Sequence, residues 1–522
     1  MERQAALESL GRPWDVIVIG GGINGAGVFR LAAASGLRTL LLEQRDFSWG
    51  ASSRTGKLVH GGLRYLLQGQ PRTTWRSVHE RERLLRGYGG LVEGLGFLFP
   101  LSKRLRLAKP LVHLALTGYE LMAGRWSYKF HRPAAFAMLA PRCDQGRLCG
   151  GFAFQDATAD DARLVYRLLQ EGRAMGGVAV NYCSARAFDR AHDGQARGLE
   201  AVDELTGRSY LARGRVILNA SGAWTDDVRA HLGQRPRLRR LRGSHLILPR
   251  WRLPLGQAVG LQHPADGRAM YVMPWEGATL VGTTDIDHEQ DMTAEPRIQP
   301  EEGAYLLEAL AYWFPSRGMG PGDVLSTYAG VRPVIDSGKK DPSKESRDHA
   351  VWSEHGVVTM TGGKLTTFGL VARQGLAAAA KWLRLSRRVE GPGLVAPRPT
   401  AADEDALAAL PSRQARRLLG RYGELAPLVA ALGDGQVVAG TDVLLAELRW
   451  AAANENVARL EDLMLRRTRL GLLSSDGGES VLDQIGAAIQ AAAGWDEARW
   501  RKERQDYRRA WREAYSPGLL TC

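Results

Sequence analysis

The first forty-five residues alternate between short apolar runs and a segment of small residues. Residues 16–19 are four β-branched residues in a row, which predicts a strand buried on both faces of a parallel sheet. Residues 26–35 are rich in small side chains and are followed by Gly36, as in a helix that ends at glycine. Residues 38–43 predict a second strand that ends in an acid. Together they predict a βαβ unit at the start of an α/β domain.

Downstream, the hydrophobic pattern changes character twice. From 244 to 361 it shortens to alternating strands and turns, which predicts an antiparallel sheet inserted between pieces of the first domain. From 401 onward it is helical, charged and poor in strands, which predicts a separate cap. Further predicted elements are helices over 72–87, 160–175 and 362–383, a strand over 215–219, and short strands near 178–182.

Glycines mark the junction between the first strand and the first helix. Gly20, Gly22 and Gly25 have the G-x-G-x-x-G spacing, in which the glycines allow a tight turn, an approach of backbone to pyrophosphate and close helix packing. Glu43 follows Gly25 by 18 residues, where a carboxylate binds the ribose hydroxyls of an adenosine and repels a 2′-phosphate. These residues predict a site for FAD or NAD. A glycine-rich turn without a ligand is the alternative.

This fingerprint occurs once in the chain. Residues 215–224 repeat the order of strand and tight turn but lack a second G-x-G-x-x-G. An enzyme that reduces its flavin with NADPH usually carries two such cradles. The single fingerprint therefore argues against that class of enzyme.

Composition and charge narrow the possible partners. A chain of 522 residues predicts two or three domains, and 70 basic against 56 acidic residues give a net charge of +14. That charge suits an anionic substrate, an anionic membrane surface or nucleic acid, or reflects solvated helix faces. Four cysteines without metal-ligand spacing predict reduced thiols and no metal site. No secretory signal or membrane-spanning run is expected, which predicts a cytoplasmic location.

Two stretches combine apolar and cationic residues. In residues 47–66, Lys57, His60 and Arg64 lie among glycines and hydroxyls with apolar anchors between them, which favours a loop around an anionic ligand over a flexible surface loop. Residues 97–126 combine apolar bulk with several cations, a composition that suits either a membrane interface or a buried helical hairpin.

Several short sequence motifs, taken in order along the chain, resemble those of the FAD-dependent glycerol-3-phosphate dehydrogenases, which are D-amino-acid-oxidase-like flavoproteins. These motifs are the opening glycine fingerprint and residues 52–66, 243–245, 274–275, 282–285, 330–333 and 362–367. The resemblance implies a Rossmann-like FAD domain, an inserted antiparallel substrate domain and a helical cap. It also implies that a dimeric peripheral protein of the cytoplasmic membrane oxidises sn-glycerol 3-phosphate and passes the electrons to membrane quinone.

Specific residues follow from this resemblance together with their chemistry. Arg332 is the leading candidate to hold the phosphate because guanidinium binds it bidentately, with Arg64, Tyr65 and Lys364 as further substrate contacts. His60 and His245 are both candidates for the base that removes the C2 hydroxyl proton, and the choice stays open. The predicted FAD contacts are Gly20, Gly22, Asn24, Gly25, Glu43, Ser52, Ser53, Lys57, Leu58, Gly61, Gly222, Gly363, Lys364, Leu365 and Thr366.

The predicted organisation has four parts. They are an N-terminal tail (1–14), an oxidoreductase region (15–390), a linker (391–400) and a C-terminal helical domain (401–522). Within the second part, the FAD segments are expected at about 15–70, 150–225 and 355–390, and the substrate segments at about 71–149 and 226–354.

Two departures from the family pattern leave the details of the site open. Ala51 and Gly56 replace hydroxylic residues, and Phe368 with Gly369 stands where Tyr-Arg is typical. The rival functions are an oxidase that passes electrons to oxygen and releases peroxide, an amine or amino-acid oxidase, and a basic nucleic-acid-binding protein. The last is disfavoured because the chain contains no recognised nucleic-acid module.

Overall fold

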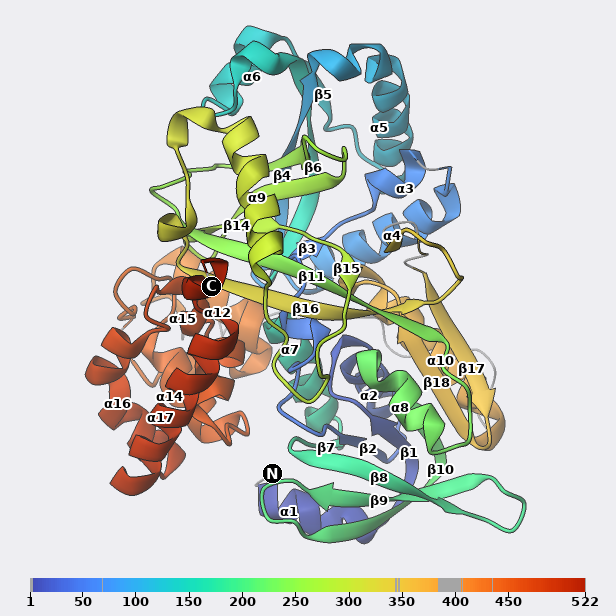
Figure 1. Ribbon diagram of the computed structural model, residues 1–522. Coiled ribbons are helices and arrows are strands. Elements are labelled where there is room, and N and C mark those ends of the chain that lie inside the picture. The colour runs from blue at the N-terminus through green and yellow to red at the C-terminus, as the bar shows by residue number, and fades with distance from the viewer. Residues whose placement is uncertain are drawn as a thin grey trace.

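The computed structural model describes residues 3–67, 69–342, 345, 348–383, 405, 407–433 and 435–521. Within these residues the strands form an eight-stranded sheet and a ten-stranded sheet, and the last hundred residues are helical (Figure 1). The α/β class with a C-terminal helical region is therefore confirmed. The predicted linker over 391–400 lies outside the described residues.

The first sheet is built on a parallel core. Strand β1 (Pro13–Ile19) lies between β2 (Thr39–Leu42) and β10 (Ser209–Asn219), and β7 (Val178–Val180) and β18 (Val357–Gly362) extend the sheet. Their apolar side chains are buried because helices cover the sheet, as the unbroken β-branched run predicts. The covering helices are α2 (Ile23–Ala34), α7 (Asp161–Ala174) and α10 (Phe368–Leu383), and the antiparallel strands are β8 (Cys183–Arg190), β9 (Ala196–Asp203) and β17 (His349–Glu354).

The second sheet lies at one end of the first and is mostly antiparallel (Figure 1). Its order is β15-β11-β14-β13-β12-β4-β6-β3, with β16 paired to β11 and β5 paired to β6. The bounds are β3 (Leu58–Val59), β4 (Val92–Ser102), β5 (Lys129–His131), β6 (Leu148–Ala159), β11 (Leu238–Pro249), β12 (Ala258–Gln262), β13 (Ala269–Trp275), β14 (Ala278–Gly282), β15 (Ile286–Asp287) and β16 (Ser326–Ile335). The helices around it are α3 (Leu63–Leu67), α4 (Pro71–Gly87), α5 (Lys109–Ala123), α6 (Pro133–Leu139) and α9 (Pro300–Trp313), and α8 (Thr225–Ala230) follows β10.

Strand pairing crosses the segment boundaries that the sequence predicts. β3 and β6 lie within the predicted FAD segments but pair in the second sheet, whereas β17 lies within a predicted substrate segment but pairs in the first. Residues 357–360 were expected in the inserted antiparallel sheet from their pattern, although the segment 355–390 was assigned to FAD. The first expectation is wrong, because β18 belongs to the first sheet, where it runs parallel to β10 and antiparallel to β17. The hydrophobic pattern cannot reveal these pairings, because a buried apolar run predicts a strand but does not say which other strand it pairs with.

The N-terminal residues pack onto the first sheet. Residues 3–11 were expected as a polar tail but form α1 (Arg3–Glu8) and a 3₁₀ turn (Ser9–Gly11). Ala6, Leu7 and Leu10 are buried in the core cluster that contains one face of the sheet. Helical spacing brings these three residues onto one face, and the polar residues between them concealed that pattern.

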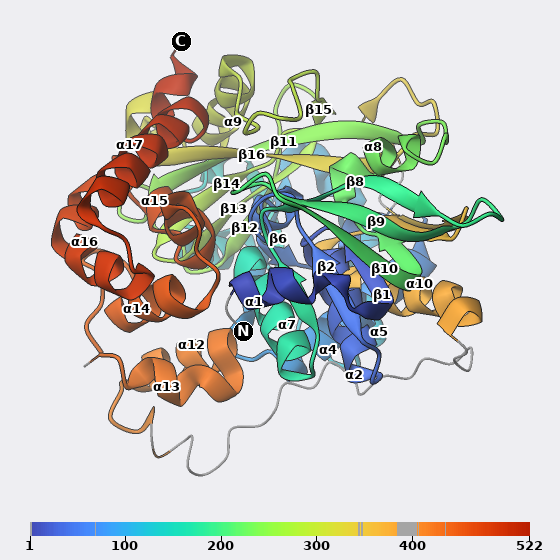
Figure 2. The same cartoon turned by 90° about the horizontal axis from the view of Figure 1, so that it is seen from below.

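The C-terminal helices gather on one side of both sheets (Figure 2). They are α12 (Ser412–Tyr422), α13 (Ala426–Ala430), α14 (Leu445–Asn454), a π-helical turn (Asp462–Arg467), α15 (Leu470–Leu473), α16 (Glu479–Ala493) and α17 (Glu497–Ala514). Buried ion pairs join them to the first sheet: Asp46 pairs with Arg466 at 2.6 Å and with Arg467 at 2.7 Å. Although burial opposes its ionisation, Arg467 and Arg466 hold the pKa of Asp46 below its usual value.

Candidate active site

The glycine turn after β1 brings backbone very close to backbone. Gly20 has a φ of +106°, and a Cβ there would lie 2.6 Å from the carbonyl oxygen of Ala220. A Cβ at Gly25 would overlap the carbonyl oxygen of Gly20, so α2 packs directly on the turn. Gly22 precedes α2, and the Ile23 amide at the helix start donates to Ser52 Oγ at 2.9 Å. The turn thus leaves a helix N-terminus beside small residues, as a pyrophosphate requires.

Glu43 lies at the end of β2 beside this turn. Its Oε2 accepts from the Gly21 amide at 2.6 Å and its Oε1 from the Arg45 amide at 2.9 Å. Burial raises the pKa of Glu43, while the two amides act to lower it. The carboxylate is thus held at the end of β2 beside the glycine turn, and its contact with a ribose stays a prediction.

The residues at the other end of the cradle also fit an FAD. Asn24 donates to the carbonyl oxygen of Gly362 at 3.2 Å, and its buried Oδ1 has no hydrogen-bond partner in the described part of the chain. Gly362 and Gly363 both have positive φ and lead into the 3₁₀ turn Leu365–Thr367, which begins α10. Thr366 Oγ1 donates to the carbonyl oxygen of His60 at 3.3 Å. Two helix N-termini and an unused acceptor thus flank the cradle.

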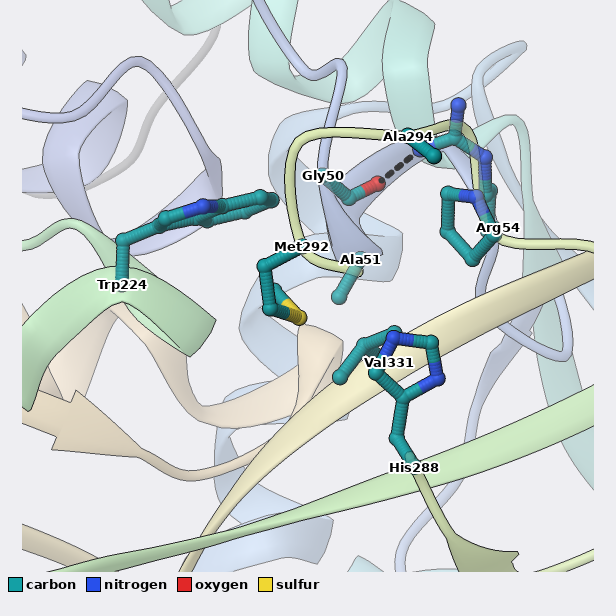
Figure 3. Close-up of a pocket in the computed structure, with 9 residues that line it drawn as sticks. Gly50, Ala51, Arg54, Trp224, His288, Met292, Ala294 and Val331 are labelled. Atoms are coloured by element: carbon teal, nitrogen blue, oxygen red, sulfur yellow. Dashed lines mark hydrogen bonds between the residues drawn. The ribbon is translucent and has the colours of Figure 1, made fainter. Parts of the chain in front are cut away.

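A small pocket lies between two of the predicted cofactor segments (Figure 3). It has a volume of about 10 Å³, room for about one water. Its walls include Gly50 and Ala51, which precede the buried Ser52 and Ser53, and Trp224, in the turn that begins at Gly222. The pocket is lined by Gly50, Ala51, Arg54, Trp224, His288, Met292, Ala294, Pro296 and Val331.

Strand register brings the second half of the site together in one row of the second sheet. His245 on β11 pairs with Tyr328 on β16 and with Gly282 on β14, and Gly282 pairs in turn with Tyr271 on β13. The imidazole stacks on the Tyr328 ring at 4.6 Å between centroids. A Cβ at Gly282 would overlap the imidazole, so this glycine lets His245 lean toward Tyr271.

His245 is a neutral imidazole in this environment. Its Nε2 lies 3.3 Å from the Tyr271 hydroxyl, and its buried Nδ1 has no hydrogen-bond partner among the described residues. Burial, followed by the charges of Arg332 and Lys57, holds the pKa of His245 well below its usual value. The imidazole is therefore unprotonated near neutral pH, which leaves one ring nitrogen with a free lone pair, although the lowered pKa also makes it a weaker base than an ordinary histidine.

Arg332 extends over the same face of the sheet, four residues beyond Tyr328 on β16. Its guanidinium donates to Asp285 Oδ1 and to Thr283 Oγ1, both at 2.9 Å. A Cβ at Gly243 would overlap the guanidinium, so that glycine makes room for it. The side chain stays 29% exposed, which leaves an open face for an anionic ligand.

His60, Tyr65 and Lys364 form a second cluster beside the N-terminus of α10. The ammonium group of Lys364 lies 4.3 Å from the centroid of the Tyr65 ring and donates to Ser77 Oγ at 2.8 Å. Burial lowers the pKa of Lys364 to about 8, and burial followed by Lys364 lowers the pKa of His60 to about 4. Arg64, on α3, is exposed and adds positive charge near His60.

Three predicted cofactor contacts already have partners inside the protein. Lys57 is fully buried, and its ammonium group binds both oxygens of Asp161 at 2.8 Å. The Gly61 amide donates to Asp156 Oδ1 at 3.0 Å, and Leu58 of β3 pairs with Thr158 of β6. Contacts of these three residues with FAD stay a prediction, and the ammonium group of Lys57 acts in the ion pair.

Sequence reasoning missed Tyr271 and Asp285 as members of the site. Tyr271 contacts His245, and Asp285 orients Arg332. Asp285 ends the word 282–285 that carries the family resemblance, which was the available signal. Tyr271 had no signal, because its contact with His245 depends on the pairing of β11, β14 and β13.

The two departures from the family pattern lie at different depths. Gly56 lies in the site, where a Cβ would overlap the Tyr271 hydroxyl. Phe368 is fully buried, and a Cβ at Gly27 of α2 would lie 2.7 Å from its ring. The residue pair Phe368 and Gly369 therefore contributes to helix packing behind the cradle.

A dinucleotide cradle beside an antiparallel sheet is an arrangement typical of flavin-dependent oxidoreductases. Comparison with family models agrees: residues 15–368 match "FAD dependent oxidoreductase" and residues 373–500 match "C-terminal domain of alpha-glycerophosphate oxidase". The chain is therefore an FAD-binding oxidoreductase.

Known relatives narrow the class. The aerobic glycerol-3-phosphate dehydrogenase of Staphylococcus haemolyticus is 34% identical over 377 residues, 71% of this chain and 68% of that protein. The Staphylococcus aureus protein of the same name is 33% identical over the same shares. The chain belongs to this family of FAD-dependent glycerol-3-phosphate dehydrogenases and oxidases.

Solved structures agree with this assignment. A glycerol-3-phosphate dehydrogenase from Bacillus halodurans in complex with FAD has 26% identity and a TM-score of 0.78, covering 98% of this chain and 97% of that one. An L-α-glycerophosphate oxidase from Mycoplasma pneumoniae shares the fold at a TM-score of 0.59 and 16% identity, covering 72% and 96%.

Proposed function

We propose that this protein oxidises sn-glycerol 3-phosphate to dihydroxyacetone phosphate and passes the electrons to a membrane quinone. Bound FAD would supply the hydride acceptor, at flavin N5, for the hydrogen on C2. The observation that carries the proposal is that each of two cations lies near a histidine whose pKa is lowered: Arg332 near His245, and Lys364 near His60.

The cations suit a phosphate dianion. Arg332 offers a planar guanidinium held at its edge by Asp285 and Thr283, so it can bind phosphate bidentately. Lys364 and Arg64 add charge from the facing cluster, and Tyr65 lies between Lys364 and the His60 ring. The names of the curated relatives support the same substrate.

The two histidines suit proton removal from the C2 hydroxyl. Both have lowered pKa values, so both are unprotonated at neutral pH. A neutral imidazole within reach of a substrate hydroxyl can take its proton as C2 loses hydride. Either His60 or His245 fills that role in the proposal.

We further propose that the protein is a homodimer on the cytoplasmic membrane and docks through α5. Leu111, Leu114 and Leu121 lie along one face of α5 and are exposed, and Leu107, in the 3₁₀ segment before the helix, is 94% exposed. Residues on the opposite face of α5 are buried, and Figure 1 has α5 and α6 at the same end of the molecule. No helix among the described residues has the length and apolar character needed to cross a bilayer.

The charge around α5 favours an anionic surface. Lys103, Lys109 and Lys129, in α5 and the segments that flank it in the chain, are exposed, and Trp126 is 64% exposed. Lysines and a tryptophan around an apolar stripe are typical of segments that lie in a membrane interface.

Steady-state assays test both parts of the reaction. Purified protein should reduce an artificial dye or a soluble quinone with sn-glycerol 3-phosphate but not with glycerol. In air without quinone, little peroxide should form per substrate consumed. One peroxide per substrate, at the rate seen with quinone, would instead establish the oxidase.

A further inference from the structure

Tyr271 has a hydroxyl group that lies within hydrogen-bond distance of two other groups. Its oxygen lies 3.1 Å from the carbonyl oxygen of Gly56 and 3.3 Å from His245 Nε2. A phenol carries one hydrogen, and a carbonyl oxygen has none to donate. Both contacts are hydrogen bonds only if the hydroxyl donates to the Gly56 carbonyl oxygen and Nε2 of His245 carries a proton that it donates to the phenol oxygen.

Gly56 makes this arrangement possible. A Cβ at position 56 would overlap the Tyr271 hydroxyl. The phenol therefore reaches the carbonyl oxygen only because residue 56 has no side chain. Tyr271 and Gly56 thus act as one unit beside the imidazole.

We infer that Tyr271 is a positioning residue that holds His245 as the Nε2–H tautomer, so that Nδ1 carries the free lone pair. Nδ1 has no hydrogen-bond partner in the described part of the chain, so no described protein group competes for its lone pair. Which ring nitrogen is protonated is set by the hydrogen bond that the other makes. For the proposed oxidation, on which this role rests, proton acceptance at His245 would take place at Nδ1.

The groups around the imidazole come from every element packed against it. Arg332 and Tyr328 lie on β16, Tyr271 on β13, and Lys57 precedes β3. Stacking on Tyr328 fixes the ring plane, and Arg332 and Lys57 disfavour a charged imidazole. None of these contacts selects a tautomer, so that selection falls to Tyr271.

Nitrogen NMR of the FAD-loaded protein with ¹⁵N-labelled histidine tests the inference without substrate. The His245 signals are identified as those lost in His245→Gln. Wild-type protein should show a protonated Nε2 and an unprotonated Nδ1 at pH 7.5. Tyr271→Phe, which keeps the ring and removes the hydroxyl, should lose this single form and give a tautomer mixture or the Nδ1–H form.

Two further variants separate this role from simple packing. Tyr328→Phe removes the hydroxyl that bonds the Thr55 carbonyl oxygen at 2.8 Å and keeps the stacking ring, so it should leave the His245 signals unchanged. Gly56→Ser should change them as Tyr271→Phe does, because it displaces the phenol. The double variant Gly56→Ser with Tyr271→Phe removes the hydroxyl with which the serine would clash. It should therefore recover the melting temperature lost in Gly56→Ser, but it should not recover the single Nε2–H tautomer of His245.

An Nδ1–H tautomer in the wild type, or identical His245 signals in wild type and Tyr271→Phe, would overturn the inference. Failure of the proposed reaction would look different. It would leave the tautomer signals as expected while glycerol 3-phosphate fails to reduce the flavin.

Discussion

Arg332 presents a guanidinium to the site while Asp285 and Thr283 hold it by one edge. Asp285 also pairs with Arg268 at 2.8 Å, so its charge is shared between two arginines. Removal of Arg332 therefore leaves Asp285 with a cationic partner. The change should alter substrate recognition more than stability.

Arg332→Met should raise KM for glycerol 3-phosphate by about 10- to 100-fold, since a charge-assisted hydrogen bond is worth about 1.5 to 3 kcal/mol. A smaller loss is expected in kcat. Steady-state kinetics with a dye acceptor measures both. The matched control Arg268→Met removes the other partner of Asp285 and should change KM by much less. If the two variants raised KM equally, the effect would come from the loss of a partner for Asp285, and the proposed contact between Arg332 and the phosphate would be contradicted.

Lys364 should make substrate binding depend on pH in the alkaline range. Burial lowers its pKa to about 8, so the ammonium is charged below that pH and neutral above it. The value of kcat/KM should therefore fall as pH rises above about 8, by about tenfold per unit. Lys364→Arg keeps its charge and should remove this fall. An unchanged profile in Lys364→Arg would assign the ionisation to another group.

The sequence predicted the site residues that lie within distinctive motifs. It missed Tyr271, which reaches the site only through the pairing of strands. His245 and Arg332 each follow a glycine by two residues, and the structure shows that Gly243 makes room for the Arg332 side chain. Tyr271 could not be found, because the row that joins it to His245 exists only once three strands have paired.

Helix α5 has one face buried in the protein and another face exposed to solvent. Val112, Leu116 and Tyr119 are buried, whereas Leu111 and Leu114 are exposed. The sequence left a buried hairpin and a membrane interface both open. The structure has β4 leading through a 3₁₀ segment into one helix, so a helical hairpin does not form there.

Replacement of Leu111, Leu114 and Leu121 by serine should weaken binding to anionic phospholipid vesicles by at least about tenfold, because each leucine contributes about 1.5 kcal/mol or more when buried. Vesicle sedimentation measures this. The control pair Leu211→Ser and Trp251→Ser removes exposed apolar residues from other elements and should leave binding unchanged. Equal binding by the leucine variant and the wild type would exclude α5 as the docking element.

The hydrophobic period predicted several of the long helices but missed α9 (Pro300–Trp313), which lies within the stretch 244–361 that was expected to hold only strands and turns. The helices over 72–87 and 160–175 appear as α4 and α7 with shifts of at most one residue at each end, whereas the helix over 362–383 begins only at Phe368, after the end of β18 and a 3₁₀ turn. Strand partners were less accessible, as β18 shows, since period alone does not reveal which sheet a strand joins.

At the scale of the whole molecule, buried arginines join the C-terminal helices to the FAD region. Arg469 pairs with Asp160 at 3.0 Å and also with Asp161, which binds Lys57 beside the site. The sequence predicted a separate helical cap but not this attachment. Charges on a helix are usually solvated, so nothing in the pattern marks Arg469 as buried.

Arg469→Met should destabilise the protein by about 3 kcal/mol or more, because it leaves buried carboxylates with one cation fewer. The melting temperature should fall, and FAD should be released at a lower temperature, since Arg469 also donates to the Ser53 carbonyl oxygen at 3.2 Å. Flavin fluorescence during heating reports both events. Lys502→Met breaks an exposed pair with Asp506 and should change the melting temperature very little. Similar effects of the two variants would contradict the proposed attachment.

Anaerobic mixing of the FAD-loaded protein with sn-glycerol 3-phosphate is the most direct test of the proposed function. The account predicts that the visible flavin absorbance bleaches within the time of one turnover and that dihydroxyacetone phosphate forms in equal amount to FAD. Glycerol and glycine should leave the spectrum unchanged. Flavin that stays oxidised in the presence of saturating glycerol 3-phosphate would contradict the account.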